Sequence, residues 1–235
     1  RQVVTIANLD PAHPVSVSLA LADWAYDEDG APVFTPAGES DSSAAAWTRY
    51  RAPTVSLAPG QSKQVVINLS TPEPLVRTGD YRVALLASSV MKDEAGHWQK
   101  HRIASLFSLT AGKARSYPKI MASRLTVTAD GEPAIGLDLA NTGNAHARLD
   151  GVIEIRSGTE IVLSRDLKDV IVPDKGTRNL IVPLDQPLPA DPEIEIRLLN
   201  RFAPQTRRGE KSLPPYKVKT ETEVADLAIP VGGQD

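Results

Sequence analysis

Two histidines, His97 and His101, stand at a spacing that could hold a metal ion. On a helix, histidines four residues apart share one face and can ligate a single zinc ion. Here they flank Trp98-Gln99-Lys100 at the end of a predicted hairpin, where a spacing of four has no such meaning. We therefore interpret both as solvent-exposed loop histidines and expect no metal site.

An acidic run from Asp27 to Gly30 has the charge of a calcium loop but lacks its ligand spacing, which alternates acids and ends on a distal Glu. We interpret this run as a charged hairpin tip. It lies in a longer segment, Asp23 to Asp41, that contains six acidic residues and no basic one. We expect this end of the molecule to be locally acidic.

The motifs of hydrolases and nucleotide-dependent enzymes are missing from the sequence. The segment beginning Gly38-Glu39-Ser40 starts like a nucleophile elbow but continues with two polar residues in place of the second glycine. The segment from Gly209 to Ser212 lacks the first glycine of a phosphate-binding loop. Because cysteine is absent, there is also no thiolate nucleophile, no thiolate metal site and no disulfide. We predict that the protein is not an enzyme and needs no cofactor.

The charge balance is close to neutral, with 26 basic and 29 acidic side chains and a formal net charge of −3. This balance does not favour nucleic acid as a partner. Residues 201–219 carry six basic side chains against Glu210, but Tyr216 alone does not make a platform for base stacking. They favour a solvated basic loop, with a protein partner as the alternative. No apolar run approaches about 18 residues, so we expect no membrane span.

The elements around these residues read as short strands. Apolar residues alternate with polar ones from Val15 to Leu21, from Val65 to Leu69 and from Ile194 to Leu198, and turn-forming clusters separate such runs. No segment sustains a helical apolar stripe, and only Ser42 to Trp47 could wind into a turn of helix. Short strands at this spacing are typical of β-sandwiches. We expect Trp24 and Trp47 to fill the first core.

An internal repeat predicts the domain organisation. The segment Thr5–Asn8 resembles Asp138–Asn141, and Leu57–Ile67 resembles Ile171–Val182, in the same order along the chain. We therefore predict an all-β protein of two tandem immunoglobulin-like β-sandwich domains, residues 1–112 and 118–235. The chain opens in the middle of a strand pattern, so we expect a signal peptide and a first strand to lie upstream of it.

Several motifs of the first copy carry a family resemblance. Ile6-Ala7-Asn8 precedes a proline-containing turn and a strand that ends in Trp24, and Leu57-Ala58-Pro59-Gly60 precedes a valine-rich strand. Gly79-Asp80-Tyr81-Arg82 then opens the next strand. In these features residues 1–120 resemble the PapD-like periplasmic pilus and fimbrial assembly chaperones, and the second copy resembles them in architecture only.

The resemblance implies a mechanism of binding. Chaperones of this family bind unfolded pilus subunits by β-strand addition, in which the last strand of the first domain presents alternating apolar side chains. The matching segment here is Arg102–Thr110, and the residues that would face the partner are Ile103, Ser105, Phe107 and Leu109. We expect this strand to lie at a sheet edge and its side chains to be exposed, so that a charge at Phe107 or Leu109 leaves the fold unaffected.

The family also grips the terminal carboxylate of the subunit with an Arg from the first strand and a Lys on the last strand. Ser105 occupies the position that matches this Lys, and the segment that would match the Arg lies upstream of Arg1. Lys113 and Arg115 are near in sequence, although they do not match the motif, and they are our candidates for the carboxylate-gripping role.

The expected function is therefore that of a periplasmic chaperone-like protein for pilus or fimbrial-type subunits, with an outer-membrane usher as a further implied partner. The alternative is a structural or adhesive immunoglobulin-like protein of the cell envelope without chaperone activity.

Overall fold

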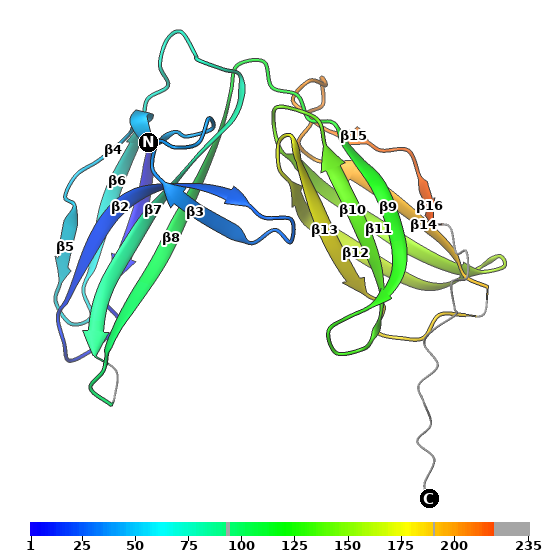
Figure 1. Ribbon diagram of the computed structural model, residues 1–235, viewed down its shortest axis with the longest axis horizontal. Coiled ribbons are helices and arrows are strands. Elements are labelled where there is room, and N and C mark those ends of the chain that lie inside the picture. The colour runs from blue at the N-terminus through cyan, green and yellow to red at the C-terminus, as the bar shows by residue number, and fades with distance from the viewer. Residues whose placement is uncertain (93–94, 190, 219–235) are drawn as a thin grey trace, which may run out of the picture. The chain divides into compact units, whose positions relative to one another are not determined.

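A computed structural model describes residues 1–92, 95–189 and 191–218 and consists almost entirely of antiparallel strands. The chain forms two compact units (Figure 1). The first contains residues 1–116 together with 142–146 and 173–175, and the second contains 117–141, 147–172 and the chain from 176 onward. The predicted all-β, immunoglobulin-like sandwich fold is confirmed. The domain ranges 1–112 and 118–235 stay a prediction.

The first unit is a sandwich of two sheets. Its strands are β1 (Gln2–Ala7), β2 (Val15–Tyr26), β3 (Pro32–Pro36), β4 (Thr48–Tyr50), β5 (Thr54–Leu57), β6 (Ser62–Leu69), β7 (Gly79–Lys92) and β8 (Trp98–Ala111). One sheet has the order β1-β6-β4, and the other has the order β3-β2-β7-β8, with β5 also paired to β2. A 3₁₀ turn, η1 (Ala45–Trp47), lies where the sequence predicted a turn of helix.

The core of the first unit lies between these two sheets. The alternation predicted from the sequence puts Val17 and Leu19 of β2 opposite Val65 and Ile67 of β6, and all four side chains are buried. A second cluster at one end of the sandwich joins Ala44, Tyr81 and Val83, and Trp47 packs against it. Trp47 thus contributes to the core as predicted.

Trp24 is buried too, with 6% of its surface exposed, but not in this core. It belongs to a separate cluster with Ala22, Ala84 and Leu86 on the opposite face of the β3-β2-β7-β8 sheet. Trp24 is thus buried in the first unit as predicted, although in a cluster other than the one between the two sheets. The alternation of buried and exposed residues in β2 breaks after Leu21, where Ala22, Asp23 and Trp24 are buried in succession.

Tyr81 makes the local contact that marks immunoglobulin-like sandwiches. At the start of β7, its hydroxyl donates a hydrogen bond of 2.7 Å to the carbonyl of Arg77, four residues upstream. The Arg77 guanidinium lies over the Tyr81 ring, 4.7 Å from its centroid. This arrangement is a tyrosine corner, which fixes the chain where it enters the strand.

The second unit repeats the two-sheet design. Its strands are β9 (Pro118–Val127), β10 (Pro133–Asn141), β11 (Ala147–Ser157), β12 (Glu160–Val172), β13 (Gly176–Pro183), β14 (Glu193–Asn200), β15 (Lys211–Ser212) and β16 (Tyr216–Val218). The sheet orders are β13-β10-β9 and β12-β11-β14-β15, with β16 also paired to β14. Aliphatic side chains such as Ile135, Ile153 and Ile196 fill the space between them.

The basic segment 201–219, expected to be a solvated loop, contains two short strands, β15 and β16, so that expectation holds only in part. Its last residue, 219, lies outside the described residues. In the part of the chain that is described, no helix has the length and apolar character needed to cross a bilayer.

Candidate functional site: the free edge of strand β8

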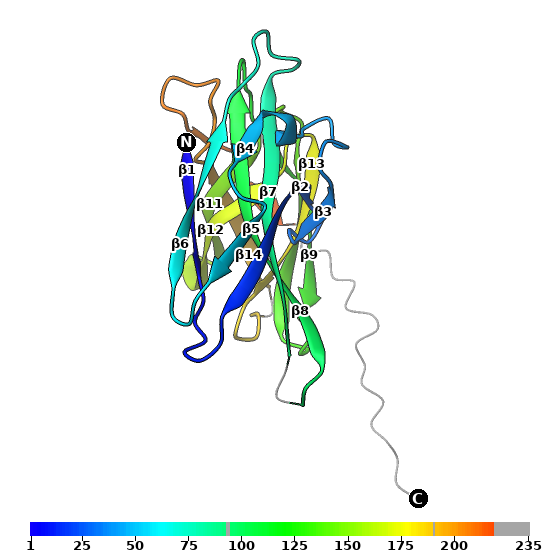
Figure 2. The ribbon, with the colours of Figure 1, turned by 90° about the vertical axis from the view of Figure 1, so that its left-hand side faces the viewer.

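Strand β8 is long and lies at the edge of its sheet. All of its residues, from Trp98 to Ala111, pair with β7, and within the described residues it pairs with no other strand. The sequence prediction of an edge strand over Arg102–Leu109 is confirmed, and the strand is longer than predicted. Figures 1 and 2 show β7 and β8 as a hairpin that extends beyond β2. One long side of β8 is therefore open to an added strand.

The register places the four predicted site residues on one face of β8. Ile103, Ser105, Phe107 and Leu109 lie opposite Ala87, Leu85, Val83 and Tyr81 of β7, respectively. This is the inner face, because Val83 and Leu85 belong to the core. Exposure falls along it: Ile103 is 74% exposed, and the other three are half-buried. Their role in binding a partner stays a prediction.

Phe107 differs from the expectation drawn from the sequence. Its ring packs against both buried clusters of the sandwich interior. The idea that a charge at Phe107 would leave the fold unaffected is therefore wrong, because the substitution would place an ionised group against the core. Ile103 is the residue of this face that can be changed without disturbing the interior.

The outer face of β8 has a different character along its length. Toward the hairpin end it carries Trp98, Lys100 and Arg102, all exposed, and farther along it carries Ala104 and Leu106. Ala104 packs against the cluster around Trp24. The outer face thus begins basic and becomes apolar.

The candidate carboxylate-gripping residues, Lys113 and Arg115, lie just after β8. Their backbones are engaged: the Asn144 side chain donates a hydrogen bond to the Lys113 carbonyl and accepts one from the Arg115 amide. Both side chains are exposed. The gripping role stays a prediction.

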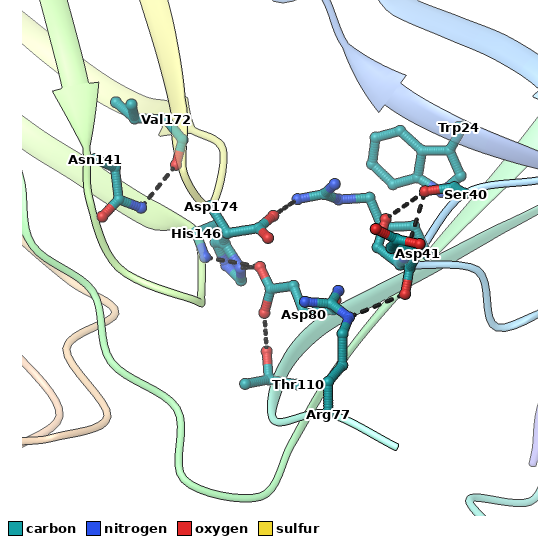
Figure 3. A network of polar contacts seen from close by, with 12 residues as sticks. Trp24, Ser40, Asp41, Arg77, Asp80, Thr110, Asn141, His146, Val172 and Asp174 are labelled. Carbon is teal, nitrogen blue, oxygen red and sulfur yellow. Dashed lines mark hydrogen bonds and ion pairs between the residues drawn. The ribbon is translucent and has the colours of Figure 1, made fainter. Parts of the chain in front are cut away.

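A buried polar network that sequence reasoning missed lies beside this segment in the first unit (Figure 3). The Asp80 carboxylate is fully buried and accepts hydrogen bonds from the Thr110 hydroxyl at 2.6 Å and the His146 backbone amide at 2.7 Å. It also lies 2.8 Å from Nδ1 of the His146 ring. Burial raises the pKa of Asp80, but the bonds from His146 and Thr110 outweigh it, so the pKa lies below the ordinary value of 3.8.

Arg82 makes a second buried contact in the same unit. Its guanidinium forms an ion pair with Asp174, and both side chains are only 9% exposed. The guanidinium also lies over the Trp24 ring, 5.8 Å from its centroid. The only signal in the sequence was the run Gly79-Asp80-Tyr81-Arg82, which marked the strand but not these partners.

The other residues singled out in the sequence have simple structural roles. The acidic run from Asp27 forms the turn between β2 and β3, where the Asp27 side chain accepts a hydrogen bond from the Ala31 amide at 2.8 Å. His97 is exposed just before β8, but His101 lies within β8, so the expectation of a loop is wrong for His101, although its side chain is exposed. Across the described ranges, no group of three or more His, Asp or Glu residues could hold a metal ion.

The known proteins that are similar to this chain are found among solved structures. No family profile and no curated protein sequence matches the chain. The class 5 fimbriae chaperone CfaA is similar at 11% identity, over 93% of this chain and 92% of that chain, with a TM-score of 0.49. The CsuC–CsuE chaperone–tip subunit complex of Acinetobacter baumannii is similar at 13% identity, over 92% and 90%, with a TM-score of 0.43.

The chaperone CupB2 of Pseudomonas aeruginosa is similar at 10% identity, over 93% of this chain and 94% of that chain, with a TM-score of 0.39. Each of these three structures contains a chaperone, and residues 1–120 resemble the pilus and fimbrial chaperones in their sequence motifs.

Proposed function

We propose that this protein is a periplasmic chaperone that binds a fimbrial-type subunit by β-strand addition at the free edge of β8. The observation that carries the proposal is this edge, a strand of 14 residues paired on one side only within the described chain. A long edge left uncovered invites association with other chains, so a protein that keeps one needs a use for it.

The chemistry of the edge suits an extended segment of a partner. Strand addition obtains affinity from main-chain hydrogen bonds and specificity from pockets for alternate side chains. The inner face of β8 offers the apolar surfaces of Ile103 and Leu109, and Ser105 leaves a gap between the larger side chains. An added strand with apolar residues on the same face would extend the sandwich interior.

Co-purification from the periplasm tests the proposal. The protein is expressed with candidate fimbrial-type subunits, and hydrogen exchange is then measured on any complex that forms. We expect the subunit to travel with the protein and the amides of residues 102–109 to exchange more slowly in the complex. Substitution Ile103→Glu should abolish capture, because a charge on the added face opposes apolar pairing.

A matched control is Leu9→Glu, since Leu9 is 89% exposed in the turn between β1 and β2, away from this edge. This variant should still capture the subunit. Capture without slower exchange in β8 would contradict strand addition. Failure of the wild type to capture any subunit would favour the alternative of a structural or adhesive envelope protein. An usher as a second partner belongs to the same proposal and is tested by the same co-purification.

A further inference from the structure

The charge pattern of β8 specifies which strand fits its edge. Residues 89–92 and 98–101 lie beyond the part of β7 that pairs with β2, so they form a two-stranded ribbon of their own (Figure 2). Both faces of this ribbon carry side chains that are exposed to solvent. Any partner strand that follows β8 to its start must pass along this ribbon.

One face of the ribbon is basic. The cross-strand pairs on this face are Lys92 with Trp98 and Val90 with Lys100, and the next pair on the same face, just beyond the ribbon, is Ser88 with Arg102. Each pair therefore supplies one cation, and successive cations of β8 lie about 7 Å apart, the spacing of alternate residues in a strand. The Lys92 ammonium lies over the Trp98 ring, 5.1 Å from its centroid, so this end of the face is already ordered.

These cations are available for a partner. Lys100 and Arg102 are exposed and form no ion pair with an acidic side chain within the described chain. Trp98 and Val90, on the same face, are 67% and 58% exposed. A cationic face with an exposed aromatic ring attracts an anionic partner.

From this pattern, and given the proposed strand addition, we infer that β8 selects a partner strand of mixed polarity: acidic at alternate positions beside Lys100 and Arg102, and apolar beside Ile103 to Leu109. Directly opposite side chains on one face of an antiparallel pair have Cβ atoms about 5 Å apart, close enough for an ion pair. Beyond Arg102 the outer face turns to Ala104 and Leu106, where an acidic side chain would lose its counter-charge. The acidic positions are thus confined to one half of the strand.

The test uses synthetic extended peptides with the full-length protein. The probe has glutamates at alternate positions in one half and valines and isoleucines in the other, and it is made in both sequence directions because the added strand can run either way. Its twin carries lysine in place of each glutamate. Binding is followed by tryptophan fluorescence, to which Trp98 contributes, and by hydrogen exchange of β8. We expect one direction of the glutamate peptide to bind about tenfold tighter than its lysine twin at low salt.

Charge reversal in the protein sharpens the test. The double variant Lys100→Glu/Arg102→Glu should weaken the glutamate peptide about tenfold and strengthen the lysine twin. A control with the same change in net charge is Lys119→Glu/Lys168→Glu, in β9 and β12 of the second unit, which should alter neither peptide. If the charges only protect the edge from unwanted strand pairing, charges of either sign serve equally well. In that case charge reversal would not change which of the two peptides binds more tightly.

The outcomes separate this inference from the proposed function. Equal binding of both peptides, with slower exchange in β8, would overturn the mixed-polarity rule and leave strand addition intact. Absence of binding by every peptide, and by the subunit, would overturn both. If the double variant abolishes adsorption to phosphatidylglycerol vesicles but changes neither peptide, the basic face serves a lipid surface and the inference is wrong.

Discussion

The indole N–H of Trp24 donates a hydrogen bond of 3.1 Å to the backbone carbonyl of Phe107, linking β2 to β8 past the intervening strand β7. The edge strand is therefore held by a side chain as well as by its ladder of backbone bonds. Phe107 in turn packs its ring into the interior from the opposite face. These contacts fix β8 in place, and under the proposed strand addition such pre-organisation would lower the entropic cost of binding.

Substitutions at Trp24 separate the hydrogen bond from the ring. Trp24→Phe keeps an aromatic ring and removes the donor, and we expect it to lower the free energy of unfolding by about 1 kcal/mol. Trp24→Ala also empties the cluster with Leu86, and we expect a loss of about 3–5 kcal/mol. Urea unfolding followed by tryptophan fluorescence reports the first unit alone, because Trp47 and Trp98 remain and all tryptophans lie in residues 1–116. Equal losses of unfolding free energy in Trp24→Phe and Trp24→Ala would show that the packing of the ring adds no stability beyond that of the hydrogen bond.

Asp80 predicts how the first unit responds to acid. Its pKa is lowered in the folded protein, so the carboxylate contributes stability that is fully present above its unfolded value of 3.8. That contribution is lost as the pH falls below 3.8 through the folded pKa. The variant Asp80→Asn lacks it at every pH, and we expect a loss of about 1–3 kcal/mol near neutral pH, since the amide cannot accept all three bonds.

The measurement is the difference in unfolding free energy between wild type and Asp80→Asn across the pH range, read by tryptophan fluorescence. The difference should be constant above about pH 5 and shrink on further acidification. Asp29→Asn, in the exposed turn between β2 and β3 of the first unit, serves as the control and should show no such pattern. A difference that grows as the pH falls would mean that the Asp80 carboxyl is protonated in the folded state.

Periodicity in the sequence predicted the fold, because a half-buried strand must alternate with period two. The run from Ile103 to Leu109 does not alternate cleanly, since Ser105 interrupts its apolar face, so both the strand and its place at the edge followed from the family resemblance. The burial of Phe107 was not predictable in the same way. An apolar residue at an edge strand has the same pattern whether its ring turns inward or faces a partner.

The buried charges could not be inferred from local sequence at all. Asp80 and Arg82 are adjacent to a turn and look like ordinary surface residues, and their partners His146 and Asp174 lie 66 and 92 residues away. Only the fold brings them together. Trp24 shows a related limit, since composition indicates that an aromatic ring is buried but not on which face of its sheet.

Gly79 marks a place where the backbone leaves no room for a side chain. Its φ angle is +117°, and a Cβ atom there would lie 2.0 Å from the carbonyl oxygen of Asn144, within the same unit. We expect Gly79→Ala to destabilise the first unit by about 4 kcal/mol or more, because neither backbone can move freely. Gly38 is the matched control: its φ is +92°, but a Cβ atom there would meet no other atom within 4 Å. Gly38→Ala should cost only about 1–2 kcal/mol of backbone strain, and comparable losses at both sites would contradict the steric argument.

The ion pair between Arg82 and Asp174 should behave as a buried pair whose partners depend on each other. Removing one partner leaves the other charge without a counter-ion in a site only 9% exposed, and we expect Arg82→Met to cost about 3–5 kcal/mol. The double variant Arg82→Met/Asp174→Leu removes both charges and should recover most of this loss, since apolar residues can replace a buried pair. The exposed pair Arg124–Asp138, at 2.8 Å, gives the contrast: Arg124→Met should cost at most about 1 kcal/mol. Urea unfolding by far-ultraviolet circular dichroism measures all three, and a double variant as unstable as Arg82→Met alone would show that the guanidinium acts through its contact with Trp24 rather than through Asp174.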